Sequence, residues 1–194
     1  MLGIVLCGGE SLRMGEDKGL LIHGGTTWAQ LAAAKLKAAG LDVKCSVNAA
    51  QRLKYLPYFN EDQLIKDDIS PKLKGPLLGV LSAHAAHPDE DLFLLACDLL
   101  LMESGIIEKL IQTAQSATTA DAFIYLRDGE QEPLCGIYRA KGLKKISRLL
   151  HDGELKRHSM KFVLSHLEVC ESIAGTADYR CFGNFNSRAS LEGL

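Results

Sequence analysis

The chain has 194 residues and a formal net charge of −2; 47% of its residues are hydrophobic and 24% are charged. This length is enough for one domain with a full hydrophobic core, and the composition is ordinary for a globular protein. So small a net charge argues against broad electrostatic binding of nucleic acid or of an anionic membrane. No apolar run approaches the roughly 20 residues that a membrane-spanning helix needs. We therefore expect a single domain over residues 1–194, with no nucleic-acid or membrane partner.

The N-terminal stretch and the cysteines both indicate a cytoplasmic protein. The chain enters an apolar run at once, without the basic flank, long apolar segment and cleavage site of a signal peptide. The six cysteines include no Cys-x-x-Cys pair, and most stand within apolar runs. We interpret them as buried free thiols in a reducing compartment. A disulfide framework or a zinc site is the alternative.

The first predicted element is a strand over residues 2–6, an apolar and partly β-branched run that ends at a glycine pair. A glycine-rich loop after a strand can direct several backbone N–H groups at one point, which suits phosphate oxygens. Arg13 and Lys18 add positive charge to this loop. Neither a Walker A loop nor a Gly-x-Gly-x-x-Gly fingerprint fits, because Gly15 precedes a glutamate and the first two glycines are adjacent. A glycine turn with solvated Arg and Lys side chains is the alternative.

The loop as a whole is more specific than its glycines. It contains the string Leu-x-Gly-Gly-x-Ser-x-Arg-Met-Gly-x-Asp-Lys from residue 6 to residue 18. This string resembles the signature loop of nucleoside-triphosphate transferases, most closely that of the molybdenum cofactor guanylyltransferase family. Cys7 stands where that family usually has alanine, and both side chains are small.

The resemblance implies roles for the residues of this loop. It assigns nucleotide binding to Leu6, Cys7, Gly8, Gly9, Ser11, Gly15 and Lys18. It also assigns Arg13 and Lys18 to charge neutralisation in the transition state.

Helices and strands alternate in the part of the chain that follows. The predicted elements are a helix over residues 28–39, a strand over 43–47, a short helix over 51–55, a strand over 64–65 and a helix over 76–86. Thr27 can cap the first of these helices and Gly40 can end it, while Pro76 suits the first position of the last.

Polar residues follow these strands at Asn48, Asp67 and Asp68. In α/β sheets, ligands lie outside the carboxyl ends of the strands, so these residues are candidates for nucleotide binding. Asn48 and Asp67 fall where the resembling family contacts the base and ribose, and an aspartate could accept two hydrogen bonds from guanine. Strand spacing favours Asp67 slightly and does not separate it from Asp68. Gly75 opens a Gly-Pro-Leu-x-Gly segment that reads as a helix start and also resembles a segment bordering the nucleotide.

The second half continues the alternation. The predicted elements are a strand over residues 92–96, a helix capped by Ser104, strands over 122–126 and 134–138 around a polar loop over 127–133, helices over 142–150 and 160–166, short strands near 167–170 and 180–182, and a final short helix. Such alternation predicts a parallel sheet with right-handed crossovers. The fold class is therefore α/β, a three-layer α/β/α Rossmann-like arrangement with a mostly parallel central sheet, as the resemblance to nucleotidyltransferases also implies.

Asp98 directly follows the apolar run over residues 92–96. A carboxylate close to the protein interior is costly unless it is paired or binds a cation, and magnesium suits it. A helix-capping or salt-bridged aspartate is the alternative. The string Ala96-Cys97-Asp98 resembles the family's metal-binding motif, in which a proline usually stands where this chain has Leu100. The resemblance implies that Asp98 binds magnesium and the nucleotide and takes part in catalysis.

Two later segments also match the family. Asn186 closes an Asn-Phe-Asn string that resembles a motif closing the site in related nucleotidyltransferases. Its amide oxygen makes it a candidate second magnesium ligand, with an asparagine in a turn as the alternative. Residues 131–138 resemble a segment that helps bind the second substrate, and a turn followed by a strand is the alternative.

The resemblance implies an enzyme that transfers GMP from magnesium-bound GTP to the phosphate of molybdopterin or its molybdenum-bearing form, releasing pyrophosphate. A phosphate monoester is already ionised near neutrality, so the reaction needs positioning and charge neutralisation more than a general base. GTP and molybdopterin are the expected partners, with cofactor-delivery and molybdoenzyme-acceptor proteins as further candidates. Two alternatives stay open. One is cytidylyl or other nucleotidyl transfer to molybdopterin or to a sugar or alcohol phosphate, and the other is a non-catalytic nucleotide-binding accessory protein.

Overall fold

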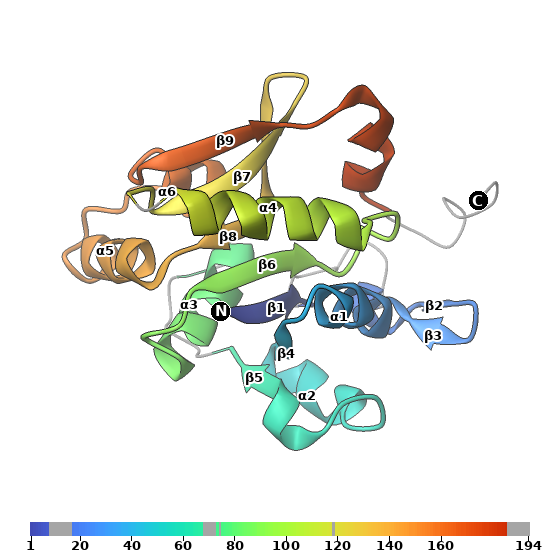
Figure 1. The fold of residues 1–194 in the computed structure, drawn as a ribbon. Coiled ribbons are helices and arrows are strands. Elements are labelled where there is room, and N and C mark those ends of the chain that lie inside the picture. The colour runs from blue at the N-terminus through green and yellow to red at the C-terminus, as the bar shows by residue number, and fades with distance from the viewer. Residues whose placement is uncertain (8–16, 68–72, 74, 118, 186–194) are drawn as a thin grey trace.

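A computed structural model gives the fold (Figure 1), and it describes residues 1–7, 17–67, 73, 75–117 and 119–185. Its main sheet has seven strands in the order β5-β4-β1-β6-β8-β7-β9. The strands are β1 (Leu2–Leu6), β4 (Asp42–Val47), β5 (Leu64–Lys66), β6 (Leu92–Ala96), β7 (Ala122–Arg127), β8 (Glu130–Tyr138) and β9 (Val169–Ile173), with a separate hairpin of β2 (Ile22–His23) and β3 (Thr26–Thr27). The α-helices are α1 (Trp28–Ala38), α2 (Ala49–Tyr55), α3 (Pro76–Ala86), α4 (Ser104–Ser116), α5 (Ala140–His151) and α6 (Met160–Leu164), and the 3₁₀ helices are η1 (Lys18–Leu20), η2 (Glu61–Gln63) and η3 (Thr176–Phe182).

Helices cover both faces of the main sheet. Alternate strand residues point to opposite faces, so Val5 and Phe93 pack on the side of α1 and α4, while Ile4 and Leu94 pack on the side of α3, α5 and α6. All four of these side chains are fully buried. Strands covered on both faces read as continuous apolar runs, which is why β1 and β6 have the predicted bounds. The predicted three-layer α/β/α class is confirmed.

The sheet is mostly parallel, and β8 is the exception. It runs antiparallel to both β6 and β7, while the remaining pairs are parallel. The prediction of a polar loop over residues 127–133 is wrong, because β7 and β8 extend toward each other and leave only Asp128 and Gly129 between them. These two residues have φ values of 51° and 76°, which a tight hairpin turn requires. Antiparallel pairing follows from this short connection, since a parallel pair needs a much longer crossover.

Three other local predictions need correction. The predicted strand over residues 180–182 is part of η3, a turn that buries Cys181 and Phe182 and packs the Phe182 ring 5.3 Å from that of Tyr125. The predicted strand near residues 167–170 is β9, which begins at Val169 and runs on to Ile173. Glu103, whose side chain makes no capping hydrogen bond, occupies the cap position of α4, so Ser104 is the first residue of the helix and not its cap. The β2–β3 hairpin was not predicted, because two-residue strands leave no periodicity to read.

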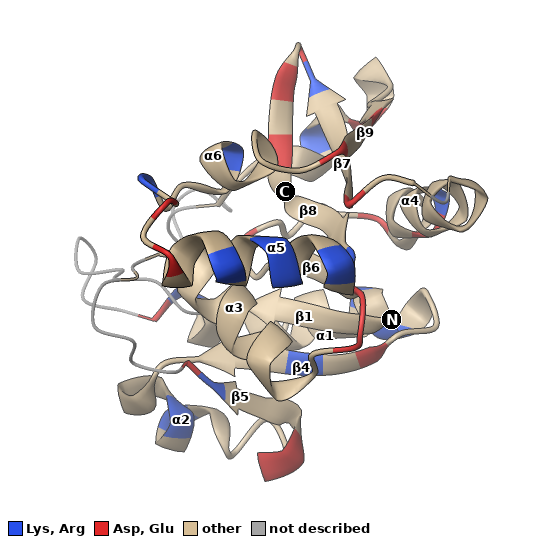
Figure 2. Cartoon of the chain, turned by 90° about the vertical axis from the view of Figure 1, so that its left-hand side faces the viewer, with Lys and Arg blue, Asp and Glu red and all other residues tan. Residues whose placement is uncertain are grey.

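The described residues include a basic helix surface and buried free thiols. Basic residues recur along α5 (Figure 2). The half-exposed side chain of Lys144 lies 2.9 Å from Asp89, and that of Lys141 lies 3.3 Å from Asp121. All six cysteines are free, and all but Cys170 are buried, as the sequence predicts. In the described part of the chain, no helix has both the length and the apolar character needed to cross a membrane.

Candidate active site

The candidate site lies at the carboxyl edge of four adjacent parallel strands. Leu6 at the end of β1 stands in register with Ser46 of β4 and Ala96 of β6, and Val47 is in register with Lys66 of β5. The residues that follow these strands therefore leave the sheet at nearly the same level. They are Cys7, Asn48, Asp67 and Cys97-Asp98.

Lys18 and Asp98 meet above this edge. The Nζ atom of Lys18 lies 3.2 Å from Oδ2 of Asp98, and the side chains keep 24% and 18% of their surface exposed. Because both side chains are partly open to solvent, the pair can separate. The lysine can then bind a phosphate, and the aspartate can bind a metal ion. The structure thus brings together two residues predicted to act on the same nucleotide. Other predicted site residues lie outside the described residues, namely Gly8, Gly9, Ser11, Arg13, Gly15, Asp68 and Asn186.

The turn after Asp98 is held from two directions. The Lys35 ammonium, on α1, donates to the carbonyl oxygen of Leu99 at 3.3 Å and also to that of Leu100. The Phe185 backbone N–H donates to the carbonyl oxygen of Asp98 at 3.1 Å, so the chain at Phe185 returns to this turn. Partial burial lowers the pKa of Lys35 from its ordinary 10.5 to about 8. Hydrogen bonds from α1 thus fix the segment that contains Leu100.

Asp17 is the centre of a hydrogen-bond network beside Lys18. Its Oδ1 atom accepts from the Gly19 backbone N–H at 3.1 Å, which caps η1, and from the Tyr55 hydroxyl at 2.9 Å. Its Oδ2 atom accepts from Nε2 of Gln51 at 2.8 Å. Sequence reasoning missed Gln51 and Tyr55. The one available signal was the spacing of Asn48 and Gln51, which fits a capping box and says nothing of Asp17.

Asn48 and Asp67 are each engaged within the protein. The Asn48 side chain caps α2 by accepting from the Gln51 backbone N–H at 2.9 Å. Asp67 is 4% exposed and accepts from the Ser46 hydroxyl at 2.6 Å. Burial raises the pKa of Asp67, and the hydrogen bond from Ser46 opposes that rise. The carboxylate of Asp67 is therefore turned toward the sheet, which leaves little of it accessible to a base.

Two glycines bring α3 close to the same edge. Gly75 precedes the helix with φ 73° and ψ −162°, a conformation that favours glycine. Gly79 lies in the helix's first turns, and a Cβ atom there would be 2.3 Å from the Ser46 hydroxyl and 3.3 Å from Leu6. The segment that begins at Gly75 therefore borders the ends of β1 and β4, and Pro76 begins the helix as predicted.

The two thiols beneath the site are buried and free. Cys7 and Cys97 are 6% and 5% exposed. Burial raises the pKa of the Cys7 thiol well above its ordinary value, and the neighbouring Cys7 thiol together with burial does the same for the pKa of Cys97. A buried protonated thiol is a poor nucleophile. Burial and raised pKa values therefore argue against either thiol as a nucleophile.

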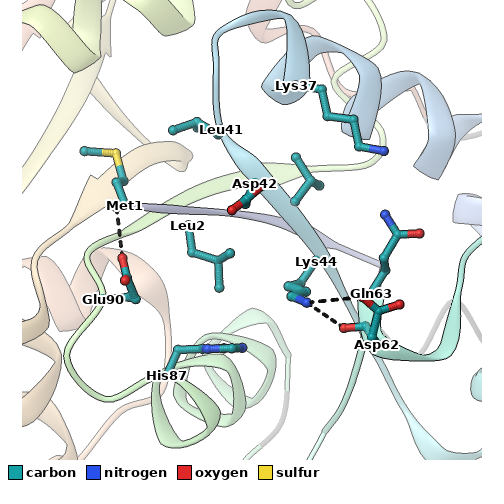
Figure 3. A pocket seen from close by; sticks show the side chains of 11 residues that line it. Met1, Leu2, Lys37, Leu41, Asp42, Lys44, Asp62, Gln63, His87 and Glu90 are labelled. Atoms are coloured by element: carbon teal, nitrogen blue, oxygen red, sulfur yellow. Dashed lines mark hydrogen bonds and ion pairs between the residues drawn. The ribbon is translucent and has the colours of Figure 1, made fainter.

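A separate cavity of about 700 Å³ lies at the opposite, amino-terminal edge of the sheet (Figure 3). Residues at the starts of β1 and β4 line it together with Lys37, Asp62 and His87. Charges of both signs line it, including an ion pair between Glu90 and the N-terminal amine at 2.9 Å. This cavity takes no part in the site around Lys18 and Asp98.

A comparison with known protein families covers most of the segments described above. A family model described as the MobA-like NTP transferase domain matches residues 3–169. The chain belongs to this family. The match includes both the first loop and Asp98.

Named relatives of this MobA-like chain span several bacteria. A "probable molybdenum cofactor guanylyltransferase" of Flavobacterium johnsoniae is 27% identical over 84% of this chain and 80% of its own length. Another protein of that name, from a Geobacillus species, is 28% identical over 87% of this chain and 84% of its own length. A "molybdenum cofactor biosynthesis bifunctional protein" of a Synechocystis species is 31% identical over 79% of this chain, which spans 43% of that longer protein.

Solved structures support the fold of this MobA-like domain. Molybdopterin-guanine dinucleotide biosynthesis protein A of Archaeoglobus fulgidus superposes with a TM-score of 0.76 at 20% identity, covering 99% of this chain and 95% of that one. The bifunctional IspDF of Campylobacter jejuni gives a TM-score of 0.71 at 15% identity, covering 100% of this chain and 54% of that one. At these identities the superpositions establish the three-layer architecture alone.

Proposed function

We propose that this MobA-like protein is a magnesium-dependent guanylyltransferase, which transfers GMP from GTP to the phosphate of molybdopterin and releases pyrophosphate. The names of the relatives supply the substrate class. The observation that carries the proposal is the 3.2 Å approach of Lys18 to Asp98, because it joins a cation and a partly exposed carboxylate at the carboxyl edge of the sheet. We assign residues 1–194 to one nucleotidyltransferase domain acting in the cytoplasm.

The donor set at the site fits magnesium. In the described ranges no group of three or more His, Cys, Asp or Glu side chains could hold a metal ion. Magnesium in phosphoryl-transfer sites needs only one or two carboxylates beside phosphate oxygens and water. Asp98 would hold it, with Asn186 as the predicted second ligand. When bound, the ion would neutralise negative charge on the phosphates of the nucleotide.

The remaining chemistry is positioning and charge neutralisation by the chain's own residues. Lys18 would turn from Asp98 toward the phosphates when these arrive, and Arg13 is assigned the same kind of contact. The acceptor phosphate is already ionised, so no side chain has to remove its proton. An oxygen of the acceptor phosphate would form a bond to the nucleotide's α-phosphorus as the bond from that phosphorus to the oxygen bridging to the β-phosphate breaks, and pyrophosphate would leave with that bridging oxygen.

A nucleotide panel tests the proposal. Pyrophosphate release is measured with GTP, CTP, UTP and ATP, each with molybdopterin and magnesium. We expect turnover with GTP well above that with the other three. Turnover with CTP alone would instead show that the protein is a cytidylyltransferase. Binding of GTP without turnover would show that it is an accessory nucleotide-binding protein.

A further inference from the structure

The side chain of Gln51 connects three segments of the candidate site. Its Nε2 atom donates to the Cys7 carbonyl oxygen at 3.0 Å and to Oδ2 of Asp17 at 2.8 Å. Its Oε1 atom accepts from the Asn48 backbone N–H at 2.9 Å. Both ends of the amide are thus used, and the residue is only 8% exposed. A primary amide can do this because it carries donors and an acceptor on one side chain.

The partner that matters most is Asp17, because it fixes the start of η1. Asp17 accepts the Gly19 backbone N–H, and Lys18 is the first residue of that 3₁₀ turn. Tyr55, one turn beyond Gln51 on α2, donates to the other carboxylate oxygen of Asp17 at 2.9 Å. Two side chains from one face of α2 therefore hold both oxygens of the carboxylate that precedes Lys18.

We propose that Gln51 is a positioning residue, which sets Lys18 against the nucleotide by tying Asp17 to the carboxyl end of β1 and to the start of α2. This proposal rests on the proposed function for its catalytic consequence. Gln51 itself contacts neither Lys18 nor Asp98 through any described hydrogen bond. Its effect passes through Asp17 and the capped turn to Lys18.

Gln51→Glu separates this role from simple capping of α2. A glutamate keeps the acceptor for the Asn48 N–H, since glutamate and glutamine both complete a capping box. It removes the donor to Cys7 and Asp17 and places a second carboxylate beside Asp17. Gln51→Met, of similar size, removes donor and acceptor together and serves as a second variant if the first fails to fold.

The chain supplies a matched control at η2. There Oε1 of Gln63 accepts from the Asn60 backbone N–H at 3.1 Å in the same capping-box arrangement. Gln63 makes no described contact with Cys7 or Asp17. Gln63→Glu therefore repeats the chemical change at a site that holds no part of the network.

Two measurements on the full-length variants test the proposal. The first is amide hydrogen exchange of the peptide containing Gly19, whose N–H depends on Asp17; we expect exchange about tenfold faster in Gln51→Glu and unchanged in Gln63→Glu. The second is steady-state pyrophosphate release, where kcat should fall on the order of 10²-fold with a smaller change in KM, as expected for a misplaced catalytic group.

The outcomes are distinct. Unchanged exchange at Gly19 overturns the proposal, and so does faster exchange with normal kcat, since Gln51 would then be structural only. A wild-type protein without turnover on any nucleotide overturns the proposed function. In that case the exchange measurement alone still decides whether Gln51 positions the turn that carries Lys18.

Discussion

The ammonium of Lys18 lies 3.2 Å from the carboxylate of Asp98, although 80 positions separate the two residues along the chain. Both side chains are partly exposed, so the ion pair itself contributes only about 0–1 kcal/mol to stability. A role in neutralising transition-state charge is far larger, on the order of 10²–10³-fold in rate. Lys18→Met and Asp98→Asn should therefore each unfold in urea much like the wild type and yet lose most pyrophosphate release.

The control for this first prediction is another ion pair near the same turn. Arg180 lies 2.7 Å from Glu103, and the two side chains are 69% and 57% exposed. Glu103→Gln should leave both stability and turnover close to wild type. Equal losses of turnover in Glu103→Gln and Asp98→Asn would show that general electrostatics, and not the site, control the rate.

Asp67 should make the chain's stability depend on pH. Burial raises its pKa above the ordinary 3.8, so the folded chain binds this proton more tightly than the unfolded chain. The contribution of Asp67 to stability is then present at low pH and is lost as pH rises through the folded-state pKa. Asp67→Asn has no such loss and can still accept from Ser46.

The measurement for Asp67 is the free energy of unfolding in urea between about pH 4 and pH 8. The variant should gain stability relative to wild type as pH rises over this window. Asp62→Asn, at a carboxylate whose side chain is 75% exposed, serves as the control and should show a flat difference. If the stability of Asp67→Asn relative to wild type instead fell as pH rises, the upward direction assigned to the Asp67 pKa shift would be wrong.

Lys35 should also make the chain's stability depend on pH, but in the alkaline range and in the opposite direction to Asp67. Its pKa is lowered from 10.5 to about 8, so between these values the unfolded chain binds more protons than the folded chain. Wild-type stability should therefore rise, relative to Lys35→Met, as pH increases from about 8 to about 10.5. Unfolding in urea at several pH values measures the difference. Lys37→Met, at an exposed lysine on the same helix, should show no such trend.

The sequence could predict those parts of the fold and site that depend on local patterns. The runs that form β1 and β6 are apolar throughout, and the rule that ligands gather at carboxyl strand ends predicted that Lys18 and Asp98 would be close. The direction of β8 was missed, because an apolar run reads the same in a parallel and an antiparallel pair. Gln51 was missed for another reason, since its contact with Cys7 joins residues 44 positions apart and depends on how α2 docks.

Gly19 is predicted to be intolerant of even one added carbon. A Cβ atom there would lie 2.1 Å from the Tyr55 hydroxyl oxygen and 3.2 Å from its ring. Tyr55 is fully buried and donates to Asp17, so it cannot move aside without losing that hydrogen bond. Gly19→Ala should cost about 1–3 kcal/mol of unfolding free energy, as overpacking usually does.

A double-mutant cycle identifies the clash as the cause. Tyr55→Phe removes the oxygen and leaves the ring, so Gly19→Ala combined with Tyr55→Phe should cost less than the sum of the two single changes. Gly105→Ala is the matched control, because a Cβ atom there meets nothing within 4 Å and the residue lies in α4. That change should stabilise the chain by about 0.5–1 kcal/mol, the usual gain of alanine over glycine in a helix. Strict additivity of the Gly19 and Tyr55 changes would mean that the phenol oxygen does not limit the space available at Gly19.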